Sequence, residues 1–299
     1  MRHILSLVLI LILMSETHTD EWGTFIDKLS NTDHGVSGNL YVADENTLFL
    51  NNFNYDGKSA DAFFLAGNVG SQPSPSGFKI PTDDGNVNPL AKSKDQEFLL
   101  KLPNMKVSEL KWFSVWSDKS KKSLGEVIFK KDSFQIPKNY SFGPIPGAHH
   151  NVHASEGVLT TDKTILLKNF NYDGLGPDAY FLAGKGESIN HENAIKIPNE
   201  QGSLKPVPKY SMQTIELTLP DNKTWSDFNW FSLYCIKYTQ NFASVFLPDK
   251  HVLPPYNVLR KKWGPHTTGG GISATTITSR WIHMVLSILV IYLLSVVSS

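Results

Sequence analysis

The chain has 299 residues, with 28 Lys and Arg balanced by 28 Asp and Glu, and a single cysteine. This length allows about two domains of ordinary size. A net charge of zero argues against a protein held to nucleic acid mainly by neutralisation of phosphates. Aromatic residues make up 11% and charged residues 19%, so a core can form and general disorder is excluded.

Residues 1–19 are predicted to be a signal peptide. Met1, Arg2 and His3 form a short basic start, and the apolar run 4–14 follows. A run of about eleven residues is typical of a signal peptide and is too short to span a bilayer. No clear Ala-x-Ala site is present, so we expect cleavage within residues 15–19 and entry into the secretory pathway.

The C-terminus predicts a glycosylphosphatidylinositol (GPI) anchor. The hydrophobic tail, 284–299, contains an apolar run of about fourteen residues, fewer than the roughly twenty of a spanning helix, and no Lys or Arg follows it. The preceding polar stalk, 257–283, contains small residues at the spacing from the tail that GPI attachment requires, and the candidates are Gly270, Gly271 and Ser273. A plain tail anchor or a short spanning helix is the alternative. The expected location is the extracellular face of the plasma membrane.

Two Asn-x-Ser/Thr sequons, at Asn139 and Asn222, are candidate N-glycosylation sites in a secreted chain.

An internal repeat organises the rest of the chain. The sequence Asn-Phe-Asn-Tyr-Asp-Gly at 52–57 returns at 169–174, and Asp-Ala-Phe-Phe-Leu-Ala-Gly at 61–67 returns with one change at 178–184. Shorter matches follow, with Lys-Ile-Pro at 79–81 and 196–198, Leu-Pro at 102–103 and 219–220, and Trp-Phe-Ser at 112–114 and 230–232. A period of about 117 residues is far longer than a solenoid repeat, so it predicts duplication of a whole domain.

We therefore expect one domain at 22–137 and a second at 138–256, joined in a segment rich in proline and glycine. Short apolar or alternating runs, separated by turn residues, predict strands in the first copy at 47–50, 62–65, 97–102, 111–116 and 126–129. No segment has a long helical stripe, although residues 108–110 are compatible with a single turn. The predicted fold class is all-β, with two tandem antiparallel β-sandwich or barrel domains.

The repeated residues resemble the DM-thirteen (Skeletor-type) domain family over both copies. The resemblance is carried by the Asn-Phe-Asn-Tyr-Asp-Gly turn, by Asp-Ala-aromatic-Phe after it, by Leu-Pro before the Trp-Phe-Ser strand, and by the His-x-Val segments that begin at His34 and His150. It implies a β-rich extracellular module with a suggested electron-transfer role centred on a cysteine in the late Trp-rich strand. That cysteine matches Cys235 in the second copy, whereas Ser117 occupies the position in the first.

Cys235 is therefore the redox candidate. A single cysteine in a secreted chain is a free thiol, half of an intermolecular disulfide, or a ligand or redox relay. On a strand it would share a face with Phe231 and Leu233, and Lys237 would favour the thiolate if it lay close. The alternative is a buried cysteine that packs as a small apolar side chain.

Other candidate residues have structural alternatives. His149, His150 and His153 are weak candidates for binding copper or zinc, but their spacing matches no standard site, and histidines of a linker or strand start are the favoured interpretation. The paired acids Asp56 with Asp61, and Asp173 with Asp178, suggest calcium or acid–base chemistry, but Tyr-Asp-Gly is also what a tight turn needs. The Trp-Phe-Ser strands could present an aromatic surface to sugars or haem, and core packing is favoured.

Three classes of function follow. The favoured one is a non-catalytic module that binds an extracellular protein or matrix polymer, attached to the membrane through the lipid anchor, with no nucleic acid partner. The alternative is a redox accessory that uses Cys235 for electron transfer or a mixed disulfide. No cofactor of the chain itself is predicted, and a haem or copper centre would have to come from a partner. A hydrolase lacks motif support, since neither a nucleophile elbow nor a nucleotide-binding loop occurs.

Overall fold

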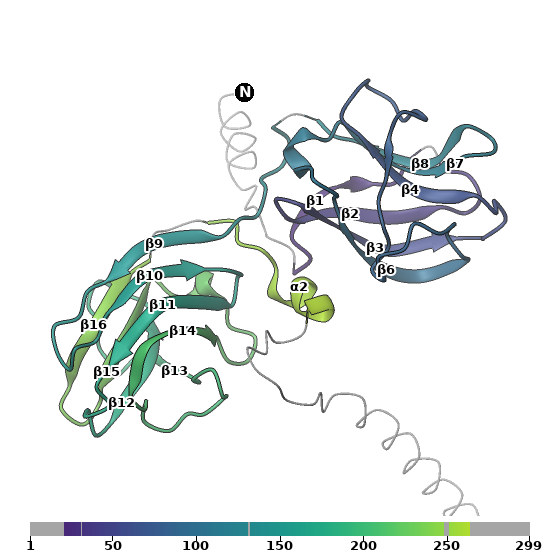
Figure 1. Cartoon of the computed structure of the whole chain (residues 1–299). Helices are drawn as coiled ribbons and strands as arrows, with labels where there is room; N and C mark the ends of the chain where they lie inside the picture. The colour runs from purple at the N-terminus through teal and green to yellow at the C-terminus, as the bar shows by residue number, and fades with distance from the viewer. Residues whose placement is uncertain (1–20, 31, 131, 248–250, 264–299) are drawn as a thin grey trace, which may run out of the picture. The chain divides into compact units, whose positions relative to one another are not determined.

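The computed structural model describes residues 21–30, 32–130, 132–247 and 251–263. The expected signal peptide, the candidates Gly270, Gly271 and Ser273, and the hydrophobic tail lie outside these residues. The all-β prediction is confirmed: each repeat consists of two four-stranded antiparallel sheets (Figure 1). The two sheets of a repeat are separate, so the sandwich is the alternative that the structure shows.

The first repeat pairs its strands in the orders β1-β2-β3-β6 and β5-β4-β7-β8. The strands of the first sheet are β1 (Thr24–Lys28), β2 (Ser37–Asp44), β3 (Thr47–Tyr55) and β6 (Ser93–Lys101). Those of the second sheet are β4 (Ala62–Gly67), β5 (Phe78–Lys79), β7 (Trp112–Ser117) and β8 (Lys122–Ile128). A 3-10 turn, η1 (Val107–Glu109), precedes β7 and agrees with the single helical turn expected there.

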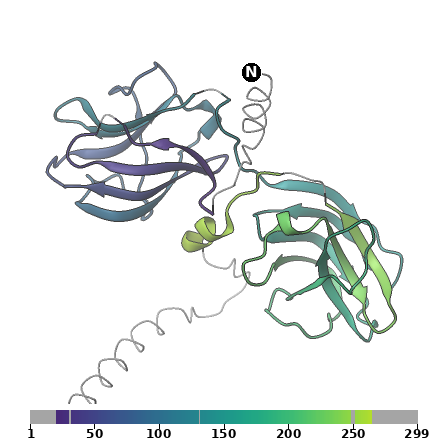
Figure 2. The ribbon, with the colours of Figure 1, turned by 180° about the vertical axis from the view of Figure 1, so that it is seen from behind.

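The second repeat has the same arrangement, with the orders β14-β11-β10-β9 and β13-β12-β15-β16 (Figure 2). Its first sheet contains β9 (Tyr140–Ile145), β10 (Ala154–Leu159), β11 (Thr164–Tyr172) and β14 (Tyr210–Thr218). Its second contains β12 (Ala179–Gly184), β13 (Ile195–Ile197), β15 (Trp230–Cys235) and β16 (Gln240–Phe246), and η2 (Trp225–Asp227) precedes β15. Strand for strand, the two halves are copies of one fold.

Helix α2 (Tyr256–Trp263) is an element that the sequence analysis did not predict. It begins at the end of the second repeat and extends into the segment expected to be a polar stalk. The backbone N–H of Tyr256 donates to Asp162 Oδ1 at 2.8 Å, so a carboxylate between β10 and β11 holds the start of the helix. Such a contact between distant residues cannot be read from local periodicity. In the described part of the chain, no helix is both long and apolar enough to cross a membrane.

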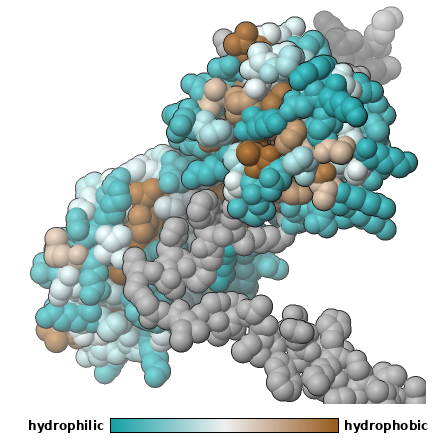
Figure 3. Space-filling model, turned by 45° about the vertical axis from the view of Figure 1, so that its right-hand side comes forward, coloured by the Kyte–Doolittle hydropathy of each residue, from teal (hydrophilic) through white to brown (hydrophobic). Residues whose placement is uncertain are grey.

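Each repeat has its own aromatic core. In the first, the rings of Phe53 and Phe113 both pack against Phe64, with centroids 5.3 Å and 5.8 Å from it. In the second, Phe181 lies 5.6 Å from Phe170 and 6.0 Å from Phe231. On the face shown in Figure 3, hydrophobic residues form small patches among hydrophilic ones. The apolar driving force for folding is therefore concentrated between the two sheets of each repeat.

The Asn-Phe-Asn-Tyr-Asp-Gly sequence is a strand end followed by a turn, which refines the expectation that all six residues form a turn. Its first asparagine, Asn52 or Asn169, has a φ of 51° or 49°, a left-handed conformation that asparagine tolerates better than most residues. The pairing register of β3 and β11 shifts at this point, so the asparagine is the site of a bulge. The turn glycines, Gly57 and Gly174, have φ values of 74° and 78°.

Candidate functional site

Cys235 is the last residue of β15 and its side chain is 0% exposed. It lies in the core of the second repeat together with Phe231 and Leu233, as the alternation of strand faces predicted. Trp230 and Tyr234 belong to a separate cluster on the opposite face of the sheet. The thiol therefore lies between the two sheets and not at the surface.

Two features describe the surroundings of the thiol. Tyr172 is buried in the same core cluster, and burial raises the pKa of Tyr172, with further contributions from the Asp173 carboxylate and from Cys235. The ammonium group of Lys237, which the sequence proposed as a thiolate partner, lies 5.5 Å from the centroid of the Tyr238 ring. Tyr172 is thus a neighbour that the sequence analysis missed, because it comes from a strand 63 positions earlier.

The same position in the first repeat has a different chemistry. Ser117 ends β7, is 1% exposed, and donates from Oγ to Asp61 Oδ1 at 3.1 Å. In the second repeat the matching carboxylate, Asp178, instead accepts a hydrogen bond from the hydroxyl of Tyr180 at 2.8 Å. The first copy therefore has a buried serine that is hydrogen-bonded to a carboxylate, whereas the second copy has a cysteine in apolar surroundings at the same position.

The structure brings together histidines and aspartates that the sequence analysis had considered separately. Asp173 Oδ2 lies 3.1 Å from His150 Nδ1, and Asp56 Oδ1 lies 3.5 Å from His34 Nδ1. Both aspartates also donate their backbone N–H to the carbonyl oxygen of the paired histidine. The signal available in the sequence was that the histidine and the aspartate of each pair recur at matching positions in the two copies, His34 with Asp56 and His150 with Asp173.

The turn interpretation of the acidic residues is confirmed alongside this pairing. Asp56 Oδ1 accepts from the backbone N–H of Lys58, and Asp173 Oδ1 accepts from that of Leu175, both at 2.8 Å. Such a bond between an aspartate and the N–H two residues on is what stabilises a tight turn. The aspartates of this turn are therefore structural residues that also fix the histidine rings.

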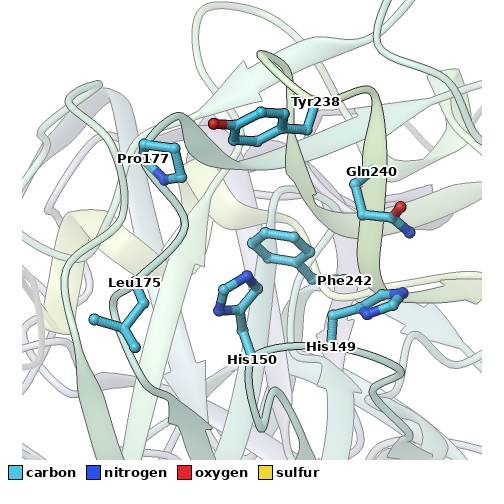
Figure 4. Close-up of a pocket in the computed structure, with 7 residues that line it drawn as sticks. All are labelled: His149, His150, Leu175, Pro177, Tyr238, Gln240 and Phe242. Atoms are coloured by element: carbon cyan, nitrogen blue, oxygen red, sulfur yellow. The ribbon is translucent and has the colours of Figure 1, made fainter.

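A pocket of about 460 Å³ opens beside the His150–Asp173 pair in the second repeat (Figure 4). The lining residues come from the start of the repeat, the turn after β11, the hairpin between β15 and β16, and the first residues of β16; they are His149, His150, Leu175, Pro177, Tyr238, Gln240 and Phe242. The rings of His150 and Phe242 pack at a centroid distance of 4.3 Å. Gln240 is the register partner of Cys235, so the pocket lies next to the thiol position without including it.

The three histidines of this region do not converge. His153 donates from Nδ1 to the carbonyl oxygen of Asn151 at 3.1 Å, and His150 is held by Asp173. In Figure 4 the ring of His149 lies on the far side of Phe242 from that of His150. Within the described residues, no three His, Cys, Asp or Glu side chains are grouped so as to hold a metal ion.

The Trp-Phe-Ser strands are core elements in both copies, as favoured above. All six residues of β7 and of β15 are buried. Trp112 and Trp230 pack directly over glycines, because a Cβ atom built at Gly67 or Gly184 would lie 2.1 Å or 2.0 Å from the indole Cζ2 atom. This contact explains why the Leu-Ala-Gly sequence recurs with the tryptophan in each copy.

Comparisons with known proteins agree with this duplicated architecture. The family profile described as "Electron transfer DM13" matches residues 28–129 and 146–247. Over 237 residues, 78% of this chain, the sequence is 34% identical to Protein Skeletor, isoforms B/C, and equally to isoforms D/E, both from Drosophila melanogaster. The chain covers 30% and 16% of the length of these relatives. No solved structure matches the chain.

Two segments match the family profile, the strand order is the same in both repeats, and the turn, the tryptophan strand and the histidine recur in each. The chain therefore belongs to the DM13 family and carries two DM13 domains in tandem.

Proposed function

We propose that the protein is a GPI-anchored extracellular surface protein whose two DM13 domains form a non-catalytic module that binds an extracellular protein or matrix polymer. The observation that carries this proposal is the complete burial of Cys235. A thiol at 0% exposure is not accessible to attack a disulfide of another protein. Binding through the domain surface therefore fits the geometry better than exchange of disulfides.

Two further observations support the surface location. The sequon residues Asn139 and Asn222 are both exposed, in the loop before β9 and in the turn before η2, where a glycan would meet no core residue. The GPI signal, by contrast, is argued from the sequence, because its residues lie outside the described part of the chain. The anchor is therefore tested chemically.

The anchor is tested by treating cells that express the full chain with phosphatidylinositol-specific phospholipase C. We expect the protein to move into the medium, and replacement of Gly270, Gly271 and Ser273 together by bulky residues to abolish surface display. A protein that stays on the cells after treatment, while a known GPI-anchored marker is released, contradicts the lipid anchor.

The binding function is tested by the retention of the released protein on cell-free extracellular matrix, compared with the heat-denatured protein. The state of the thiol is followed in parallel with Ellman's reagent, using Cys235→Ser as the blank. We expect retention by the native protein, and no thiol reaction until denaturant unfolds the second domain. Prompt labelling of the native protein would contradict the non-redox function.

Electron transfer is the second candidate, because Cys235 and Tyr172 are buried in the same core cluster and an electron, unlike a disulfide partner, does not need surface contact. In this function the thiol gives one electron to an oxidised haem or copper centre of a partner protein and its proton to solvent, which leaves a thiyl radical. Spin trapping after one-electron oxidation by hexachloroiridate(IV) tests it. A cysteine adduct absent from Cys235→Ser supports electron transfer, and identical spectra from both proteins contradict it.

A further inference from the structure

The pocket of the second domain, lined by the seven residues named above, differs systematically from the same surface of the first domain. Strand pairing aligns Gln240 with Lys122, since each faces the last residue of the preceding strand, and the paired histidines align His149 with Asp33. In the first domain Lys122 Nζ and Asp33 Oδ2 form a salt bridge of 2.7 Å. At the two equivalent positions the second domain has His149 and Gln240, which form no such salt bridge and instead line the open pocket.

The rim of the pocket has also changed from charged or small residues to apolar ones. Leu175 and Tyr238, which are 73% and 65% exposed, take the positions of Lys58 and Ser120. Exposed leucine and tyrosine side chains grouped around one depression are the kind of apolar surface that marks a ligand-binding groove. The second copy has therefore lost charge and gained exposed apolar area at the same point.

The lining restricts the chemistry of a ligand. None of the seven lining residues is Lys, Arg, Asp or Glu, so the lining itself offers no permanent charge to a strongly ionic ligand. The Asp173 carboxylate accepts the Nδ1–H of His150, so Nε2 is the ring nitrogen that this contact leaves available to a ligand. Gln240 adds an amide that both donates and accepts.

We propose that this pocket binds an uncharged saccharide unit. The exposed ring of Tyr238 provides a flat apolar surface for the C–H face of a pyranose, while His150 Nε2 and the Gln240 amide bind its hydroxyl groups. A pyranose has an apolar C–H face and hydroxyl groups around its edge. A pocket with one aromatic side chain and a few uncharged polar groups can therefore contact both parts of the sugar. This inference rests on the proposed binding function and names its ligand class.

The test measures binding of the full-length protein, purified in detergent, to four neutral probes: chitotetraose, cellotetraose, laminaritetraose and maltotetraose. The central variant is His149→Asp with Gln240→Lys, which copies the Asp33–Lys122 salt bridge into the second domain. We expect the protein to bind at least one probe, and the double variant to weaken that binding at least tenfold. Tyr238→Ser, which introduces the residue of the first domain, is expected to weaken it about fivefold.

The matched control is the reverse exchange in the first domain, Asp33→His with Lys122→Gln, which should leave the affinity unchanged. Circular dichroism and the melting temperature of each variant establish that it is folded; Tyr238→Ser alters only an exposed side chain and keeps the test valid if the double variant does not fold. Binding to none of the four probes, or equal binding by the protein and its folded pocket variants, overturns the inference.

The failure of this inference is distinguishable from the failure of the proposed function. Retention on extracellular matrix that no saccharide displaces and that Tyr238→Ser does not change would preserve the binding function and reject the saccharide pocket. Loss of matrix retention altogether would reject both.

Discussion

Ser117 Oγ donates a hydrogen bond of 3.1 Å to Asp61 Oδ1 at the end of β7, and Cys235 occupies the equivalent position at the end of β15. The two domains therefore differ in polarity at a site that is buried in both. In the first domain the Asp61 carboxylate accepts the hydrogen bond of the serine. In the second domain the matching carboxylate, Asp178, instead accepts a hydrogen bond from the hydroxyl of Tyr180. Cys235 is therefore a residue of the hydrophobic core, and any redox chemistry would be additional to this packing role.

Replacement of Cys235 by serine should destabilise the second domain. The hydroxyl would face Phe231 and Leu233 while Asp178 stays bonded to Tyr180, and an unpaired buried polar group costs about 1–3 kcal/mol. Cys235→Ala buries no polar group and should cost less. Urea unfolding of the three proteins measures the difference, and a serine variant at least as stable as the alanine variant contradicts the assignment.

Gly184→Ala should be among the most destabilising single changes in the second domain. The added methyl group would lie 2.0 Å from Trp230 Cζ2, so the indole ring must move within a closely packed cluster. Overpacking of this kind typically costs about 1–3 kcal/mol.

The control for Gly184→Ala is Gly202→Ala, at a position with a φ of 77° and open space around the added atom. It should show only the cost of the left-handed backbone, about 1–2 kcal/mol. Thermal melts compare the two, and equal midpoints would show that the contact between glycine and tryptophan is not close.

Asp61 should make the first domain sensitive to acid. Burial raises the pKa of Asp61, but hydrogen bonds from Ser59 Oγ, the Lys119 backbone N–H and Ser117 Oγ outweigh it and bring the pKa below its ordinary value. A carboxyl whose folded pKa is lowered contributes stability that is present above the unfolded pKa and lost as the pH falls through the folded one.

The Asp61→Asn variant should therefore melt at a lower temperature than the unmodified protein at pH 7. The difference between the two melting temperatures should shrink as the pH falls from about 5 to about 2. A gap that stays constant over this range would show that the charge of Asp61 contributes nothing.

Asp162 should behave in the opposite way. Burial raises its pKa, which the hydrogen bond from the Tyr256 N–H only partly offsets. A raised carboxyl pKa means that folding favours the protonated form of Asp162. The contribution of Asp162 to stability therefore improves as the pH falls through its folded-state pKa towards its unfolded-state pKa. Asp162→Asn keeps an oxygen acceptor for Tyr256 and removes the buried charge.

The expected result for Asp162→Asn is a melting temperature at pH 7 that is equal to or above that of the unmodified protein. The contribution of Asp162 to the melting temperature of the unmodified protein improves on mild acidification, and this contribution should be absent from the melts of the variant. A marked loss of stability at neutral pH would show that the negative charge itself holds the start of α2.

The sequence alone determined the duplication, the all-β class and the faces of the tryptophan strand. These follow from local properties: repeated motifs, turn residues, and the alternation of side chains along a strand. The asparagine at the bulge was visible as part of a motif, but was assigned to a turn because its left-handed conformation depends on the pairing of β3 and β11 with their neighbours.

Only the tertiary structure decided which distant residues meet. The pairing of His150 with Asp173, the neighbourhood of Cys235 and Tyr172, the pocket beside them, and the helix held by Asp162 all join residues from different strands or loops. Spacing along the chain does not specify such contacts, because the packing of two sheets sets which ends and turns come together. Burial of the thiol, likewise, is a property of the sandwich as a whole and not of the strand that carries it.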